Sequence, residues 1–195
     1  MKRVLLGLGS NRPYKSYTSL ELLSFAGKEL LSVLIDCEFS SVYRTKAMYY
    51  ENQQDFYNMV AAGYVNDDKN PFELLKTINQ IEAKYGRDRK KEFRNGPRSL
   101  DIDIELFGDD VVCTQVLEIP HKRLSERAFV LIPSLEVLTK PADELIRKKF
   151  ACYLDEIKKN TSVDDVQKIY SFTKAEAYGT EEQCCRNSNN GETCL

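Results

Sequence analysis

The chain has 195 residues, of which 42% are hydrophobic and 30% are charged, values that suit one globular domain with appendages. The formal net charge is −2, so the chain as a whole is not a basic nucleic-acid binder. Six cysteines form no C-x-x-C pair and there is one histidine, which excludes a structural zinc site of ordinary spacing. Because its apolar runs are too short for a signal peptide or a membrane span, we expect a cytoplasmic protein with reduced cysteines.

The first part of the chain predicts a strand, a helix and two more strands. A buried strand is expected at 4–8, ending in a Gly-Ser-Asn turn. Thr18 begins a capping-box pattern, and apolar residues follow it at helical intervals as far as Leu34. Further strands are expected near 37–43 and at 56–65.

A second helix and a fourth strand complete the predicted core. Asn70 is a suitable N-cap, Pro71 fits the first helical position, and Gly86 stands where a glycine commonly ends a helix. Strict alternation of apolar and acidic residues then predicts a strand at 100–106. The order β-α-β-β-α-β is ferredoxin-like, an α+β fold with an antiparallel sheet and helices on one face.

Beyond this core we expect C-terminal additions. They comprise a strand within 111–119, a helix within 125–138 that is interrupted before Pro133, and an amphipathic helix at 146–157. The expected organisation is a main domain at 1–160, an extension at 161–178 and a disordered tail at 179–195.

The fourth strand carries a row of carboxylates. With a period of two, Asp101, Asp103 and Glu105 share one face, while the leucines and isoleucines face the helices. Asp101 and Asp103 then lie roughly 6.5–7 Å apart along the strand. Their charges repel by about 2.5 kcal/mol at an effective dielectric near 20, and two Mg²⁺ ions would turn that repulsion into a binding site. The alternative is the solvated face of an amphipathic strand.

A basic loop precedes this strand. Residues 87–98 include six lysines and arginines, with glycines near both ends and a proline at the exit. Arginines beside a pair of carboxylates suit polyphosphate recognition, because metal ions bridge phosphate oxygens while guanidinium groups bind the others. The alternative is a solvated run of charges.

Aromatic and amide side chains complete the candidate site. Phe56 and Asn58 share one face of the third strand, and His121, Arg127 and Phe129 follow the core. Two rings and an amide can hold a flat heterocycle, by stacking worth about 1–3 kcal/mol per ring and by hydrogen bonds to its edge.

Taken together, these motifs resemble the 6-hydroxymethyl-7,8-dihydropterin pyrophosphokinases. The resemblance covers about residues 3–138, in the order of the family, and the Gly-Pro-Arg-x-Leu-Asp-x-Asp string is highly specific. It rests on Gly7-Leu8-Gly9-Ser10-Asn11, Tyr43-Arg44-Thr45, Gln54-Asp55-Phe56-Tyr57-Asn58, Gly96-Pro97-Arg98-Ser99-Leu100-Asp101-Ile102-Asp103, and Pro120-His121 with Arg127-Ala128-Phe129.

The resemblance implies an enzyme of folate synthesis that transfers diphosphate from ATP to the hydroxymethyl group of the pterin and releases AMP. It implies two Mg²⁺ ions on Asp101 and Asp103, and a pterin site made of Thr45, Phe56, Asn58 and Phe129. The implied ATP-binding residues are Asn79, Glu82, Arg89, Arg98, Ile104, His121 and Arg127, and the implied catalytic residues are Arg87, Arg89, Arg98, Asp101 and Asp103.

The chain departs from the family pattern at several positions. It contains no tryptophan, and Asn95 stands where members often have one. The basic loop is one residue longer, and Phe93 is a candidate to supply the missing aromatic contact. Val116 replaces an arginine that contacts the nucleotide in some members.

Two other functions remain open at this point. One is another two-metal nucleotidyl or phosphoryl transferase on a ferredoxin-like fold, and the other is an RNA-binding module. The second is disfavoured because the fourth strand presents acids where RNA would lie. We expect small-molecule substrates, no nucleic-acid or membrane partner, and a monomer.

Overall fold

The computed structural model describes residues 1–47, 52–89, 91, 96–160 and 165–170. Within them, a six-stranded sheet has the order β5-β1-β4-β3-β8, and β2 also pairs with β4. All of these pairings are antiparallel. The strands are β1 (Lys2–Ser10), β2 (Ile35–Phe39), β3 (Val42–Thr45), β4 (Phe56–Val65), β5 (Asp101–Phe107) and β8 (Gln167–Tyr170), with a separate hairpin of β6 (Val112–Cys113) and β7 (Glu118–Ile119).

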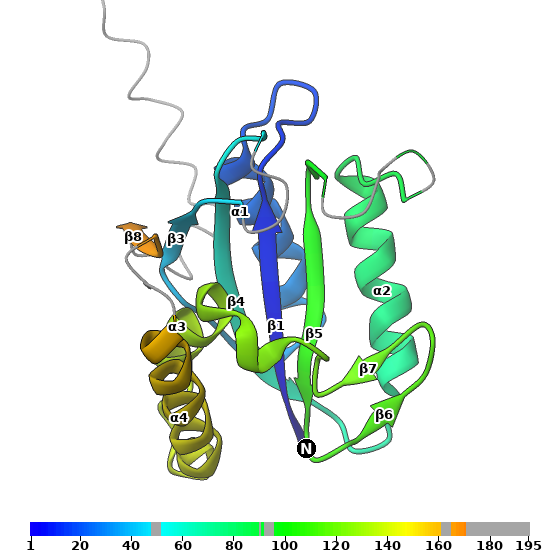
Figure 1. The fold of residues 1–195 in the computed structure, drawn as a ribbon. Coiled ribbons are helices and arrows are strands. Elements are labelled where there is room, and N and C mark those ends of the chain that lie inside the picture. Colours follow the sequence, from blue (N-terminus) through cyan, green and yellow to red (C-terminus); the bar gives the residue numbers. More distant parts are fainter. Residues whose placement is uncertain (48–51, 90, 92–95, 161–164, 171–195) are drawn as a thin grey trace, which may run out of the picture.

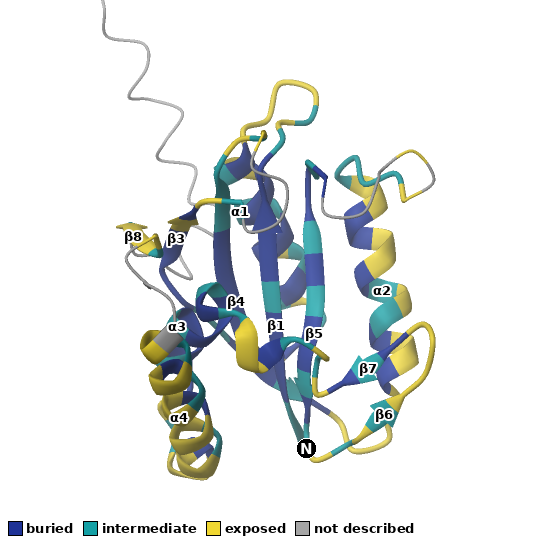
Figure 2. Ribbon diagram, viewed as in Figure 1, coloured by how far each residue is buried: buried dark blue, intermediate teal, exposed yellow. Residues whose placement is uncertain are grey.

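In the described part of the chain, four α-helices cover the sheet, with α1 (Ser19–Leu31) and α2 (Pro71–Lys84) on one face and α3 (Ala128–Val137) and α4 (Glu144–Asn160) on the other (Figure 1). The predicted ferredoxin-like core is confirmed, with α1 and α2 on one face. The C-terminal helices α3 and α4 pack on the opposite face and form a second hydrophobic cluster there. Consecutive residues of β1 and β4 are therefore buried, and they belong to the two clusters in turn (Figure 2).

The two core helices begin as their capping residues predict. Thr18 and Glu21 form a reciprocal capping box, and the Asn70 side chain accepts a hydrogen bond from the backbone of Phe72. After α2, Gly86 has φ +89°. A Cβ at Gly86 would lie 2.2 Å from the ring of Tyr14, so only glycine allows this packing at the start of the basic loop.

Three expectations about the elements were wrong in detail. The strand expected near 37–43 is two short strands, β2 and β3, separated at Ser40, whose hydroxyl accepts a hydrogen bond from Val60 N–H. The additions after β5 include a hairpin rather than one strand. Helix α3 continues through Pro133. At the sixth helical position Pro133 removes one backbone hydrogen bond, and burial of this apolar segment holds the helix together.

The alternation predicted for 100–106 ends before Leu106. Leu6 pairs with Ile104 and Leu5 pairs with Leu106, so Glu105 is the extra residue of a β-bulge. Leu106 consequently packs with the cluster around α3 and α4, while Ile104 lies in the cluster below α1 and α2. The bulge therefore leaves Glu105 and Leu106 on the same face of the sheet.

Some expectations lie outside the described residues. They are the disordered tail at 179–195, the contact by Phe93 and the departure at Asn95. From the predicted extension, β8 is described, and it pairs with β3 at the edge of the sheet. Among the described helices, we find none with the length and apolar character needed to span a bilayer.

Candidate active site

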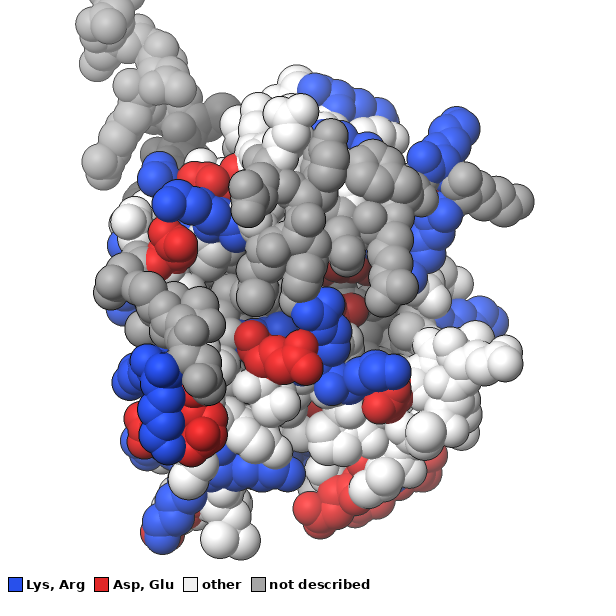
Figure 3. Space-filling model, in the orientation of Figure 1, with Lys and Arg blue, Asp and Glu red and all other residues white. Residues whose placement is uncertain are grey.

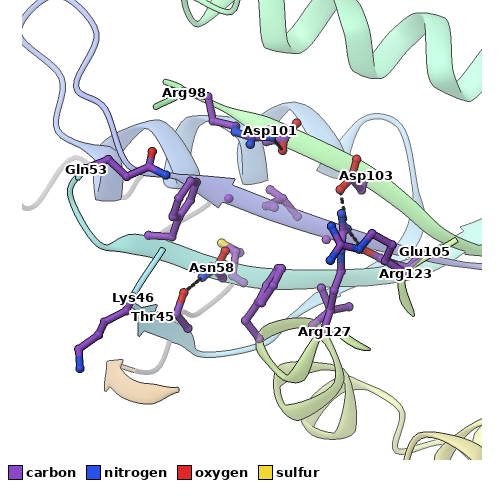
Figure 4. A pocket seen from close by; sticks show the side chains of 17 residues that line it. Thr45, Lys46, Gln53, Asn58, Arg98, Asp101, Asp103, Glu105, Arg123 and Arg127 are labelled. Atoms are coloured by element: carbon purple, nitrogen blue, oxygen red, sulfur yellow. Dashed lines mark hydrogen bonds and ion pairs between the residues drawn. The ribbon is translucent and has the colours of Figure 1, made fainter. Parts of the chain in front are cut away.

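A pocket opens on the face of the sheet that carries α3, beyond the area that α3 and α4 cover. Its floor includes Gly7 and Gly9 of β1, where the absence of side chains leaves room above the strand. The side chains around it come from β3, β4 and β5, from the loops next to them and from the start of α3 (Figure 4). Strands far apart in the sequence thus place their functional side chains around one opening.

One half of the pocket combines aromatic rings with a polar pair. Phe56 and Phe129 both line it. Between β4 and β3, Asn58 Nδ2 donates a hydrogen bond to Thr45 Oγ1 at 2.8 Å, and both residues are buried (Figure 4). This hydrogen bond leaves the side-chain oxygen of Asn58, Oδ1, and the hydroxyl proton of Thr45 for other partners. The chemistry suits the edge of a flat, polar heterocycle.

The other half combines carboxylates with arginines. Asp101 is paired with Arg98 and, at 3.0 Å, with Arg87. Asp103 accepts a hydrogen bond from Arg127 at 2.7 Å (Figure 4). Burial alone would raise the pKa of Asp101, but Arg98 and Arg87 outweigh it and hold the pKa below its ordinary value. Asp101 is therefore ionised at neutral pH.

The two halves meet through the arginines. The guanidinium of Arg98 lies 5.7 Å from the ring centroid of Phe56, and that of Arg127 lies 5.7 Å from the ring centroid of Phe129. A heterocycle between the rings would therefore lie beside the groups that can bind phosphate.

Histidine 121 lies next to the carboxylates without lining the pocket. Its Nδ1 accepts a hydrogen bond from the backbone N–H of Arg123 at 3.1 Å, which places the proton of the neutral ring on Nε2. Burial and the nearby Arg127 lower the pKa of His121, against the opposing effect of Asp103. His121 therefore presents a neutral N–H donor, 4.0 Å from Asp103.

Glutamate 82, expected at the nucleotide, is enclosed between α2 and β5. Its side chain is 1% exposed. One carboxylate oxygen accepts a hydrogen bond from Ile102 N–H at 2.9 Å, and the other accepts one from Arg89 at 2.5 Å. Burial and the charge of Asp101 raise the pKa of Glu82. This placement favours a role in positioning β5 and Arg89 over a direct contact with nucleotide.

The pocket gathers most of the residues that the sequence indicated. It brings together Thr45, Phe56, Asn58, Arg98, Asp101, Asp103, Arg127 and Phe129. Asn79 is exposed on α2, and the side chain of Ile104 belongs to the core on the opposite face. A nucleotide contact by Ile104 therefore has to come from its main chain.

Sequence reasoning did not single out Lys46 or Gln53, which also line the pocket. The sequence feature that could have indicated Gln53 is Asn11, in the Gly-Ser-Asn turn at the end of β1. Asn11 Nδ2 donates to Gln53 Oε1 at 2.9 Å, and Asn11 Oδ1 accepts from Arg98 N–H at 2.8 Å. One buried amide thus connects the segments on both sides of the pocket.

The donor set fits a hard divalent cation that substrate helps to bind. Asp101 and Asp103 direct two carboxylates into one pocket. Across the described segments, no group of three or more acidic, histidine or cysteine side chains could hold an ion without further ligands. Mg²⁺ is commonly bound in this way, by one or two carboxylates together with phosphate oxygens and water.

A ferredoxin-like fold with a ring-and-amide cradle beside paired carboxylates and arginines defines an enzyme that transfers phosphoryl groups to a heterocyclic substrate. On the face seen in Figure 3, basic and acidic side chains are interspersed, unlike the basic surface of an RNA-binding module.

Comparison with known proteins identifies the family. Residues 5–139 match the model of 7,8-dihydro-6-hydroxymethylpterin-pyrophosphokinase. The chain is 37% identical over 149 residues to the 2-amino-4-hydroxy-6-hydroxymethyldihydropteridine pyrophosphokinase of Aquifex aeolicus, covering 76% of this chain and 88% of that protein. The identity to the Bacillus subtilis protein of the same name is 45% over 98 residues, 50% of this chain and 56% of that one. A folic acid synthesis protein of Dictyostelium discoideum is 40% identical over 134 residues, 69% of this chain and 19% of that protein.

The chain therefore belongs to the 7,8-dihydro-6-hydroxymethylpterin-pyrophosphokinase family. It is an ATP-using pyrophosphokinase of folate biosynthesis, as the sequence motifs predicted. This membership decides against the RNA-binding module and the unrelated transferase.

Proposed function

We propose that the pocket binds 6-hydroxymethyl-7,8-dihydropterin and ATP side by side, and that the pterin hydroxymethyl oxygen attacks the β-phosphorus of ATP. The pterin gains a diphosphate and the leaving nucleotide is AMP. The observation that supports this proposal is the placement of Arg98 over Phe56, which joins the heterocycle half of the pocket to its polyphosphate half.

The pterin half supplies stacking and edge recognition. Phe56 and Phe129 would lie on the two faces of the pterin, and Asn58 and Thr45 would bind its polar edge. Because Asn58 and Thr45 are buried and already hydrogen-bonded to each other, their orientation is set before substrate arrives. Such preorganisation holds the hydroxymethyl group at a defined position beside the carboxylates.

The polyphosphate half supplies positive charge. Arg98 and Arg127 would bind phosphate oxygens, and Arg89 would reach them from the basic loop. The neutral His121 would donate its Nε2 hydrogen to an oxygen. Arg87 is 11% exposed and bonded to the Leu100 carbonyl and Asp101, so it acts by orienting Asp101. These groups stabilise the charge that develops as the bridging oxygen leaves.

Asp101 and Asp103 would hold two Mg²⁺ ions together with the phosphates. Bound there, the ions would neutralise the triphosphate and polarise its oxygens. The two aspartates lie in the same pocket as Phe56, so the ions and the heterocycle would share one opening.

The product of the reaction tests this proposal. The chain is incubated with ATP, Mg²⁺ and hydroxymethyldihydropterin, and the quenched mixture is separated by chromatography. We expect pterin-dependent AMP and a pterin carrying two phosphates. ADP as the main pterin-dependent nucleotide would show that attack takes place at the γ-phosphorus and would contradict the proposal.

We also propose that the enzyme acts as a cytoplasmic monomer. In support, a single chain contains both the aromatic and amide half and the carboxylate and arginine half of the pocket, so the proposed site needs no residue from a second copy. Sedimentation at the concentration of the activity assay tests this, and an active dimer would contradict it.

A further inference from the structure

Glu105 carries a buried carboxyl group that the proposed function does not use. Its side chain is 0% exposed, yet it lines the pocket. One oxygen, Oε1, accepts a hydrogen bond from Arg127 Nη1 at 3.3 Å. The other, Oε2, has no hydrogen-bond partner among the described residues and lies 3.9 Å from His121 Nδ1. Burying a carboxyl group that is not fully hydrogen-bonded costs folding free energy, so the position of Glu105 beside Arg127 requires an explanation.

The fold makes specific room for this side chain. The β-bulge in β5 sets Glu105 outside the regular pairing with β1. On the neighbouring strand, a Cβ at Gly7 would lie 2.9 Å from Glu105 Oε1. A side chain at position 7 would therefore require the Glu105 carboxyl group to shift from its present position. Bulge and glycine together direct Oε1 toward Arg127.

Arg127 shares one nitrogen between two carboxyl groups. Its Nη1 donates to Asp103 Oδ2 at 2.7 Å and to Glu105 Oε1 at 3.3 Å (Figure 4). Asp103 is a proposed ligand of Mg²⁺, and a bound cation competes with Arg127 for the Asp103 oxygens. Arg127 would keep Glu105 Oε1 as an acceptor if Asp103 bound a cation.

We propose that Glu105 is a positioning residue that gives Arg127 an acceptor independent of Asp103, so that Asp103 can bind a divalent cation without displacing Arg127. This inference rests on the proposed role of Asp103 as a metal ligand. Glu105 acts through Arg127 and contacts neither metal nor substrate. Without Glu105, Arg127 depends on Asp103 alone and competes with the cation.

The experiment measures cation binding directly. Mn²⁺ is titrated with each protein in the presence of α,β-methylene-ATP, and free Mn²⁺ is quantified by electron paramagnetic resonance. The variants are Glu105→Met, Glu105→Gln, Arg127→Met and the double variant Glu105→Met with Arg127→Met. Glutamine keeps an oxygen acceptor and methionine keeps only the size. A thermal melt of each variant shows that it is folded.

Loss of the acceptor in Glu105→Met is expected to weaken Mn²⁺ binding by about tenfold, the scale of one hydrogen bond to a charged group. Glu105→Gln is expected to stay within about twofold of the unchanged protein, because its oxygen still accepts from Arg127. Once Arg127 is methionine, adding Glu105→Met is expected to have less than about a twofold effect. The Mg²⁺ concentration that gives half the maximal rate follows the same order, with KM for the pterin unchanged.

Each other outcome overturns a distinct claim. Equal Mn²⁺ affinity of Glu105→Met and the unchanged protein overturns the inference. An equally large effect of Glu105→Met with and without Arg127 also overturns it, because Glu105 would then act on the metal directly. No Mn²⁺ binding by the unchanged protein overturns the metal site itself, and this inference with it. If Glu105→Met does not fold, a tenfold loss in Glu105→Gln contradicts the acceptor role.

Discussion

Glu82 gives the sharpest test of how the core supports the site. The family resemblance implied a contact between Glu82 and the nucleotide, whereas in the structure Glu82 is enclosed and bonded to Ile102 N–H and to Arg89. If it positions β5 and Arg89, Glu82→Ala has to lower both stability and turnover. If it binds nucleotide, the main effect has to be on KM for ATP.

The structure sets the scale of the stability effect. Truncation at Glu82 leaves the buried Ile102 N–H without its acceptor, which costs about 1–3 kcal/mol. For a chain of this length each kcal/mol lowers Tm by about 2–4 °C, so the expected fall is about 2–12 °C. Glu82→Gln keeps an oxygen for Ile102, and its stability is expected to lie between those of the alanine variant and the unchanged protein.

The turnover effect comes from Arg89. Without the Glu82 carboxylate, Arg89 loses the ion pair that orients it, and displacement of a catalytic group by about 1 Å can cost up to 100-fold in rate. Denaturant unfolding and steady-state kinetics measure the two effects. Gln80→Ala, an exposed change on the same helix, is the control and is expected to alter stability by less than about 0.5 kcal/mol. A Glu82→Ala protein with unchanged stability and kcat but a raised KM for ATP refutes the positioning role.

Three further predictions concern the pocket and the C-terminal strand. Asp101→Asn is expected to lower kcat by about 100-fold or more in the product assay, and also to lower Tm because Arg87 and Arg98 lose an ionised partner. Phe56→Ala is expected to raise KM for the pterin by roughly 5- to 150-fold, corresponding to about 1–3 kcal/mol of lost stacking, with KM for ATP nearly unchanged. Burial alone would raise the pKa of Glu136, but hydrogen bonds from Lys168, Ser41 N–H and Tyr43 outweigh burial and lower it. The ionised Glu136 side chain therefore stabilises the folded state above the unfolded pKa, near 4.3, and this stabilisation is lost as the pH falls further. Glu136→Gln should therefore reduce unfolding free energy by up to about 1 kcal/mol at pH 7 and by progressively less as the pH falls below the unfolded pKa, and a reduction that does not change with pH contradicts this reasoning.

Local patterns predicted the core of the fold well. The capping box at Thr18, the N-cap at Asn70 and the glycine at 86 depend on a few neighbouring residues, and the structure confirms all three. The strand at 56–65 was predicted with its observed bounds, because its apolar run is long and is bounded by polar residues. Periodicity is reliable where a segment is long and its burial is uniform.

The remaining features depend on contacts between distant segments. The bulge at Glu105 is defined by pairing with β1, and nothing within 100–106 signals an extra residue. The continuity of α3 through Pro133 depends on burial against β4 and α4. β8 forms at the edge of β3 and is anchored by Lys168, whose partner Glu136 lies on α3. Such features follow from tertiary packing rather than from local preference.

In the candidate site, too, some features were predicted from the sequence and others depend on tertiary packing. Residue types indicated which side chains gather, and the pocket contains both proposed metal ligands and all four proposed pterin residues. Sequence could not separate the side chains that face the opening from those that hold them. Arg87 and Glu82 are of the second kind, since each is bonded to β5 and mostly enclosed.

The ion pairs of the pocket lead to one last prediction, about the order in which ligands bind. Asp101 is paired with Arg98 and Asp103 with Arg127, so these carboxylate and guanidinium charges compensate each other before any ligand binds. A cation alone would take both aspartates from arginines that are no more than 20% exposed, leaving Arg98 poorly solvated and Arg127 with Glu105 as its remaining carboxyl partner. A triphosphate supplies new anionic partners for Arg98 and Arg127. We therefore expect α,β-methylene-ATP to tighten Mn²⁺ binding by more than about tenfold, since each charged hydrogen bond regained is worth about 1.5–3 kcal/mol. Titration of Mn²⁺ with and without the analogue measures the difference, and equal affinities in the two titrations would show that the arginines do not exchange carboxylate for phosphate.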